Sequence, residues 1–335
     1  MHDNYLMLLL LHLGALIIHS ISCGFAWGHN KSVFTNRNIW YTKFEYTSTN
    51  ISVITDSTPV YVGEKQNYMS WVTANEFITA LSHLLAIFTM LITGKYYNHT
   101  YEIGRRTVEY IMTAAVLQVA LVLGAGDILF QDVVFIFVIN TAIQYIGYQI
   151  DKIEYVYYYK DRGFFTTSER ARGSDNWEFS APLFGTAFLL LVSEIIYVYT
   201  LSTTIDFGPG PLEDQTTFLI FGGIMYIIFY VSFGLVKFIG HYLYDFKDNE
   251  DVIYVILSVT CKISLSWILI GNIYNGFYNL CEHTSNEKCE IIKKDDFYGN
   301  WNGAQIGFSI FGILGIILSV IYGYINAEGL RTERF

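Results

Sequence analysis

Eight apolar stretches, each long enough to cross a lipid bilayer, are the feature that most constrains how this chain can fold. A bilayer core about 30 Å thick is spanned by about 20 apolar residues in a helix. Only 15% of the residues are charged, compared with about 25% in soluble domains. The sequence therefore predicts an all-α membrane protein with spans near 5–27, 71–95, 106–124, 128–149, 180–201, 216–239, 251–275 and 304–326.

The basic residues in the loops predict how the chain is oriented. Lysine and arginine concentrate in cytoplasmic loops, and they do so here if the N-terminus is cytoplasmic, since the outer loop 202–214 has none. A cleaved signal peptide at 5–27 is the alternative, but the leading residues MHDNY lack the usual positive charge. Both termini are therefore expected in the cytoplasm, and the plasma membrane is the expected location.

Two outer loops carry signals of their own. The first, roughly 29–70, alternates apolar and polar residues in YTKFEYTST, ISVIT and PVYVGE, which predicts a small β-hairpin or sheet. The second follows the seventh span and contains Cys281 and Cys289, which are candidates for a disulfide if that loop faces an oxidising compartment.

Charge and motif content exclude several classes of function. The net charge of −10 forms no basic patch, so no nucleic-acid partner is expected. No CxxC or HExxH pattern occurs, which leaves a metal site without support. We therefore expect neither a metal ion nor enzymatic activity.

One lysine lies in the middle of the apolar stretch 251–275. At about 1.5 Å per residue, Lys262 is roughly 16 Å into the bilayer core, where a charged side chain costs roughly 2.5–3.5 kcal/mol. It needs a carboxylate partner, a water-filled cavity, or a reaction that uses its amine. A buried lysine is the usual nucleophile that condenses with an aldehyde. The residues alone leave a Schiff-base lysine and an ion-paired structural or transport lysine both open.

Polar residues in the third and seventh spans are candidate partners of this lysine. Glu109 lies three residues after Arg106 and four before Thr113, so these side chains share one helix face. Glu109 either pairs with Lys262 or pairs only with Arg106 near the interface. Ser258, one turn before Lys262, is placed to hydrogen-bond a counterion or the imine nitrogen, although membrane serines also bond to their own helix.

Aromatic and titratable side chains complete the candidate set. Tyr226, Phe229, Tyr230 and Phe233 form an aromatic face suited to clamp a flat apolar ligand, although such faces more often serve helix packing. Trp267 is suited to wall a pocket or to face lipid. Three further groups in the spans either relay protons or hydrogen-bond between helices, and these are His12, His83 and Glu194.

Together these positions resemble the heliorhodopsins, a family of retinal-binding membrane proteins that are inverted relative to other microbial rhodopsins. The similarity covers roughly 1–275. Its motifs are Arg106-Thr-Val-Glu109-Tyr110 in the third span, Phe233-Gly-Leu-Val in the sixth and Ser258-Val-Thr-Cys-Lys262 in the seventh. Single residues of matching type are His12, His83, Asn140 and Trp267. Ordinary microbial rhodopsins match less well, because they typically carry aspartate where this chain has Ser258.

The resemblance implies a seven-helix rhodopsin-like bundle over 1–275 in which all-trans-retinal forms a protonated Schiff base on Lys262, with Glu109 as counterion. It also implies a β-structured first loop and a homodimer within the lipid. The other residues expected to contact retinal are Thr113, Asn140, Tyr226, Phe229, Phe233, Ser258 and Trp267.

The chain departs from the family in two ways. Glu194 occupies a position that is apolar in the relatives. An eighth span follows the bundle, so 276–335 is expected to form an outer loop, a helix at about 304–326 and a cytoplasmic tail.

Three functions remain open. The first is light-activated proton conduction, with Arg106, Glu109, His12 and His83 toward the inside and Glu194 toward the outside. The second is a slow light sensor that moves no ions and is read by a partner or by its dimer mate. The third needs no retinal and pairs Lys262 with Glu109 in an ordinary transporter or receptor. The extra carboxyl of Glu194 favours the first.

Overall fold

The computed structural model describes residues 4–30, 36–47, 56–93, 99–126, 128–160, 173–204, 213–242, 249–271 and 301–332. This part of the chain is mostly helical and contains eight helices long and apolar enough to cross a membrane, which confirms the predicted spans and the integral membrane character. The uninterrupted helices are α1 (Asn4–His29), α2 (Tyr68–Thr93), α3 (His99–Ala125), α4 (Phe130–Lys160), α5 (Gly173–Thr204), α6 (Glu213–Tyr242) and α12 (Trp301–Thr332).

The seventh span, which we call the lysine helix, is not a uniform α-helix. It consists of α8 (Glu250–Leu257), a π-helical turn η3 (Ser258–Lys262) and a further helical stretch over 263–271. Such π-turns hold an extra residue and often occur at functional sites. Lys262 is the last residue of this turn.

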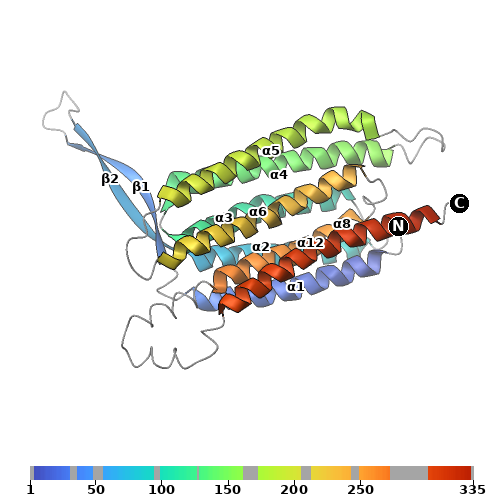
Figure 1. Cartoon of the computed structure of the whole chain (residues 1–335), viewed down its shortest axis with the longest axis horizontal. Helices are drawn as coiled ribbons and strands as arrows, with labels where there is room; N and C mark the ends of the chain where they lie inside the picture. The colour runs from blue at the N-terminus through green and yellow to red at the C-terminus, as the bar shows by residue number, and fades with distance from the viewer. Residues whose placement is uncertain are drawn as a thin grey trace.

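The helices lie side by side, and a β-hairpin projects from one end of the bundle (Figure 1). We call this the hairpin end; α1 begins and α12 ends at the opposite, terminal end. Consecutive helices pack from α1 to α5, while α8 contacts α1, α6 and α12. Because α3 and the lysine helix are the most enclosed spans, their side chains meet in the centre of the bundle.

The predicted outer sheet is present in the first loop. Strand β1 (Asn36–Thr47) pairs antiparallel with β2 (Asp56–Asn67). A third strand, β3 (Ile128–Leu129), joins β1 in parallel beside Ile39 and Trp40. Sequence reasoning did not find β3, because two residues are too short for an alternating pattern. The ISVIT segment predicted as a strand, 51–55, lies outside the described residues.

The eighth helix packs against the bundle through two glycines. A Cβ atom at Gly312 would clash with the ring of Phe229, and one at Gly315 would clash with Thr260 in the π-helical turn. The Thr260 hydroxyl donates a 2.9 Å hydrogen bond to the Ile256 carbonyl, which holds it in place. These close approaches make α12 a structural neighbour of the turn that carries Lys262.

Gly315→Ala is expected to destabilise the protein, although alanine normally favours a helix by about 1 kcal/mol over glycine. Overpacking of a tight contact typically costs about 1–3 kcal/mol. The matched control is Gly307→Ala on the same helix, where an added Cβ meets nothing within 4 Å. Thermal unfolding in detergent should show a lower Tm for Gly315→Ala and an unchanged or higher Tm for Gly307→Ala. Equal Tm values for the two variants would contradict the close packing of α12.

Candidate functional site

Lys262 and Glu109 form a buried ion pair at the centre of the bundle. The Lys262 Nζ donates to Glu109 Oε1 at 2.6 Å and to Thr113 Oγ1 at 2.9 Å. Only 7% of Lys262 and 3% of Glu109 are exposed. The ring of Tyr110 lies 4.7 Å from the same nitrogen. Of the two partners that the sequence left open for Glu109, the structure pairs it with Lys262.

A small cavity of about 60 Å³ borders the Lys262 side chain. Its wall is largely aromatic and includes Tyr110, Tyr226, Phe229, Tyr230 and Phe233. Tyr226 and Tyr230 stack with 5.5 Å between ring centroids and 19° between planes. The aromatic face recognised in the sixth span therefore points toward the lysine.

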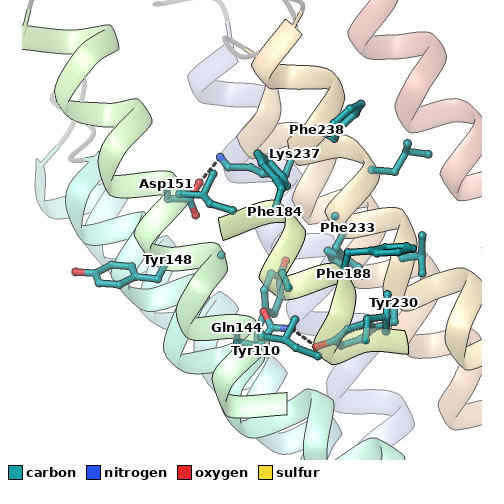
Figure 2. A pocket seen from close by; sticks show the side chains of 18 of the residues that line it. Tyr110, Gln144, Tyr148, Asp151, Phe184, Phe188, Tyr230, Phe233, Lys237 and Phe238 are labelled. Carbon is teal, nitrogen blue, oxygen red and sulfur yellow. Dashed lines mark hydrogen bonds and ion pairs between the residues drawn. The ribbon is translucent and has the colours of Figure 1, made fainter. Parts of the chain in front are cut away.

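A larger cavity of about 560 Å³ lies among α4, α5 and α6 (Figure 2). It shares Tyr110, Gln144, Tyr230 and Phe233 with the small cavity. Pockets that hold drug-sized ligands measure about 300–1,000 Å³, so the small cavity alone is below that range. The shared residues place the two cavities next to each other, with the small one beside Lys262.

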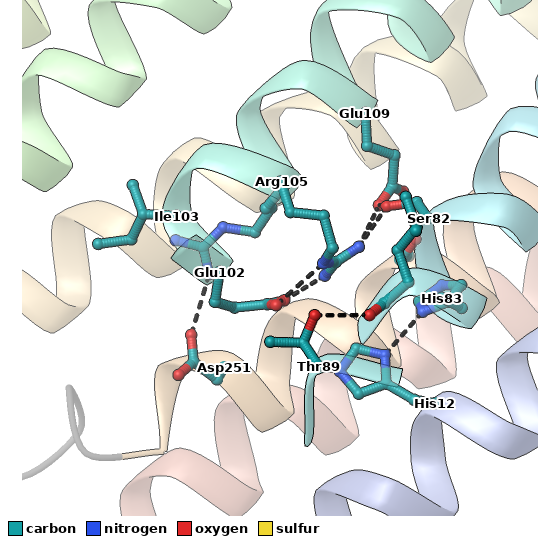
Figure 3. Close-up of polar contacts among 12 residues, drawn as sticks. His12, Ser82, His83, Thr89, Glu102, Ile103, Arg105, Glu109 and Asp251 are labelled. Atoms are coloured by element: carbon teal, nitrogen blue, oxygen red, sulfur yellow. Dashed lines mark hydrogen bonds and ion pairs between the residues drawn. The ribbon is translucent and has the colours of Figure 1, made fainter. Parts of the chain in front are cut away.

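Glu109 is also held on its side away from the lysine (Figure 3). Its Oε2 accepts hydrogen bonds from Ser82 Oγ at 2.6 Å and from Arg105 Nη1 at 3.1 Å. Arg105 in turn pairs with Glu102. The order of charges is therefore Glu102, Arg105, Glu109, Lys262, alternating in sign. Sequence reasoning missed Arg105, although its spacing of four residues from Glu109 is a readable signal.

Arg106 faces a different network at the terminal end. Its guanidinium pairs with Asp151 at 3.3 Å and with Asp251 at 3.2 Å, and lies 4.0 Å from the centre of the Tyr254 ring. Lys237 pairs with Asp151 and, at 2.6 Å, with Glu250. This terminal charge network (Arg106, Asp151, Lys237, Glu250, Asp251) joins α3, α4, α6 and α8. Figure 2 shows its Lys237–Asp151 contact at one end of the large cavity.

His12 and His83, the two histidines singled out in the sequence, contact each other. The Nδ1 atoms of His12 and His83 are 2.8 Å apart (Figure 3). The ring of His83 also stacks on His19, with 5.7 Å between centroids and 19° between planes. His19 belongs to the candidate site but was not identified in the sequence.

Glu194 lies in a separate polar cluster in α5. Its Oε1 accepts a 2.6 Å hydrogen bond from Asn140, and its buried Oε2 has no hydrogen-bond partner in the described part of the chain. Asn140 also contacts Gln118 Oε1 at 2.5 Å and accepts from the Tyr226 hydroxyl at 3.2 Å. Because Tyr226 walls the small cavity, it connects Glu194 and Asn140 to the lysine site.

Of the remaining candidates, Ser258 contacts the ion pair and Trp267 lies apart from it. Ser258 donates a long hydrogen bond, 3.5 Å, to Glu109 Oε1. Trp267 donates to Ser22 Oγ at 2.9 Å and stacks against Phe308 of α12. It lines neither the small nor the large cavity. Cys281 and Cys289 lie outside the described residues.

No protein-family model matches the sequence, and no curated protein matches it. The function must therefore be inferred from the site itself.

Proposed function

We propose that the protein is a heliorhodopsin-like light receptor that conducts protons when illuminated, with all-trans-retinal attached to Lys262 through a protonated Schiff base. In this proposal α1 to α6 and the lysine helix are the seven rhodopsin helices, and α12 is an addition to them. The observation that carries it is the buried Lys262–Glu109 pair beside an aromatic cavity. Ionisable groups inside a membrane are rare and usually functional.

The hydrogen-bond acceptors around Lys262 suit this role. Retinal bound there supplies a conjugated polyene that absorbs visible light and changes shape on excitation. Glu109, 2.6 Å from the nitrogen, stabilises a positive charge there, and Thr113 offers a hydroxyl oxygen at 2.9 Å. Ser82 and Arg105 fix the other Glu109 oxygen, so the carboxylate stays in place when the nitrogen moves.

The aromatic side chains of α6 give the ligand its position. Phe229 and Phe233 line the small cavity, and Tyr230 lines both cavities. The Tyr230 hydroxyl accepts a 2.9 Å hydrogen bond from Gln144 (Figure 2), which fixes the ring between the two spaces. A rigid wall of this kind limits which bonds of a polyene can rotate.

Titratable groups on both sides of Lys262 support proton movement. Toward the terminal end, which we take as cytoplasmic, lie the His12–His83 pair and Arg106. On another side, Glu194 is linked through Asn140 to Tyr226 in the cavity wall. Glu194 Oε2, which has no hydrogen-bond partner among the described residues, is able to bind a proton.

Glu194→Gln is expected to reduce a light-induced proton current, because glutamine keeps the size and polarity of the side chain but cannot exchange a proton. The measurement is photocurrent in voltage-clamped cells supplied with all-trans-retinal. The matched control is Ser193→Ala, an exposed residue on α5 whose hydroxyl bonds only to the Leu189 carbonyl among the contacts described. An unchanged current in Glu194→Gln removes Glu194 from the path, and no wild-type current at any voltage excludes conduction.

A light sensor that moves no ions is the second candidate, and the terminal charge network favours it. That network ties four helices together at the end where a proton has to cross. If light only rearranged these ion pairs, the change would be read by a partner or by a second copy of the chain. Wild-type protein with a visible absorption band and no photocurrent would select this function.

A further inference from the structure

We propose that Glu76 and His19 form a second internal proton-binding site for the Lys262 nitrogen, on its hairpin side and separate from Glu109. This inference rests on the proposed retinal function and adds a proton acceptor to it. Neither residue is part of the proposed proton path, which uses Glu194 on one side and His12 and His83 on the other.

Glu76 and His19 are a fully buried pair. Both are 0% exposed, and His19 Nδ1 lies 2.7 Å from Glu76 Oε2. The other carboxylate oxygen accepts hydrogen bonds from Asn75 Nδ2 at 3.0 Å and from the Ser266 hydroxyl. Burying an ionisable pair costs several kcal/mol unless hydrogen bonds compensate. Here three side chains, His19, Asn75 and Ser266, contact the Glu76 carboxyl group and compensate for its burial.

The lysine helix relates this pair to Lys262. Ser258 and Ser266 lie four residues before and after Lys262; the first donates to Glu109 and the second to Glu76. Residues at this spacing lie about 5–6 Å apart on a helix. The two carboxyl groups therefore approach the lysine from opposite sides, Glu109 from the terminal side and Glu76 from the hairpin side.

Helix α2 gives a second connection between the same groups. Thr79 lies three residues after Glu76, and its hydroxyl oxygen accepts a 3.4 Å hydrogen bond from Lys262 Nζ. On α2, Glu76 is therefore one helical turn from Thr79, a direct contact of the lysine. On the lysine helix, its partner Ser266 is one turn from Lys262. Hydroxyl groups of this kind pass protons over such a distance together with water.

Unpaired polar atoms in this cluster point to water or protons as its ligand. His19 Nε2 and Asn75 Oδ1 are buried and have no hydrogen-bond partner in the described part of the chain. If Nδ1 of His19 carries the hydrogen that bonds Glu76, then Nε2 presents a free lone pair. Such an atom accepts a proton, and the hydrogen on Nδ1 then passes to the adjacent Glu76 carboxylate, 2.7 Å away.

The proton transfer balances without any further reactant. The N–H bond at the Lys262 nitrogen breaks and its electron pair stays on nitrogen. An N–H bond forms at His19 Nε2, the N–H bond at His19 Nδ1 breaks, and an O–H bond forms at Glu76 Oε2, 2.7 Å from Nδ1. The titratable groups around the pair are Lys262 on the lysine helix, His83 on α2 and Cys23 on α1. Among these, His83 connects the pair to His12 and so to the terminal side.

The test compares light-minus-dark infrared spectra of the full-length, retinal-loaded wild type with those of Glu76→Gln. The expected result is a carboxyl C=O difference band that is lost in Glu76→Gln and kept in Glu64→Gln, an exposed position on β2 that serves as matched control. If the wild type absorbs visible light but Glu76→Gln retains every carboxyl band, the inference is overturned while the proposed function stands. A wild type without visible absorption overturns both.

Two further measurements keep the inference testable. In the retinal-free protein labelled with ¹⁵N-histidine, Glu76→Gln should shift the Nδ1 resonance of one histidine, and Glu64→Gln should not; no shift in either overturns the pair. If Glu76→Gln does not fold, Ser266→Ala replaces it, because it removes one donor and no charge. Its C=O band should move to higher frequency, and an unmoved band overturns the inference.

Discussion

Lys262→Ala is expected to abolish the visible absorption band of protein produced with all-trans-retinal, because alanine offers no amine for a Schiff base. The wild-type band and its loss are measured on purified protein by absorption spectroscopy. Lys237→Ala is the matched control, since Lys237 is the other buried lysine in the described residues and lines the large cavity. It should keep the band. A band lost in Lys237→Ala and kept in Lys262→Ala would move the attachment to the opposite end of the cavity.

Lys262→Ala should leave a folded protein, so the loss of the band reports the loss of the amine and not unfolding. Removing one partner of a buried ion pair typically costs about 3–5 kcal/mol, because the remaining charge is uncompensated. Glu109 keeps Arg105 at 3.1 Å and Ser82 at 2.6 Å when Lys262 is removed. The cost is therefore expected below that range, and thermal unfolding of the retinal-free proteins measures it. A wild-type protein without any visible band would make Lys262 and Glu109 a structural ion pair.

The fold was largely predictable because its main signal is local. Each span shows as a run of apolar residues, and the hairpin shows as alternation in the first loop. The helices nevertheless continue past the apolar runs: α4 extends to Lys160, while its predicted span ends at 149. Asp151 of the terminal charge network therefore lies on a helix and not in a loop. The π-helical turn has no spacing signal in the sequence.

The site was predictable only where its residues are neighbours along one helix. Lys262 and Ser258 share the lysine helix, and Glu109 and Thr113 share α3, so their common faces follow from spacing. Which helices turn toward each other is a tertiary property. The sequence motif singled out Arg106 beside Glu109, whereas the structure turns Arg105 toward it. That difference is one residue, or about 100° of rotation around the helix axis.

The contact between Glu76 and His19 could not be predicted for the same reason. Its members lie on different helices, and the Ser266 that completes the site comes from a third. Single ionisable residues in apolar spans are a usable signal, but nothing in the spacing matches one such residue to another. Glu194 was found by that signal, while its contact with Asn140 depends on how α4 packs on α5.

Glu109→Gln is expected to shift the visible band to longer wavelength and to destabilise the protein. A carboxylate beside a protonated nitrogen holds the positive charge at that end of a polyene, while excitation moves charge away from it. Without the carboxylate, moving the positive charge along the polyene costs less energy, so the excitation energy falls. The substitution takes from the Lys262 nitrogen its carboxylate partner at 2.6 Å, while Arg105 loses Glu109 and keeps Glu102. Removing one partner of a buried ion pair typically costs about 3–5 kcal/mol.

Absorption spectra and thermal unfolding of the same samples separate these two effects. Glu102→Gln is the control, because it removes a carboxylate from the same series of charges but not from contact with Lys262; its partner is Arg105. It should lower the Tm and leave the absorption maximum near that of the wild type. The distance from the nitrogen decides between the variants, since a charge interaction weakens as the separation grows. An unshifted band in Glu109→Gln, together with a shifted band in Glu102→Gln, would show that the counterion lies elsewhere.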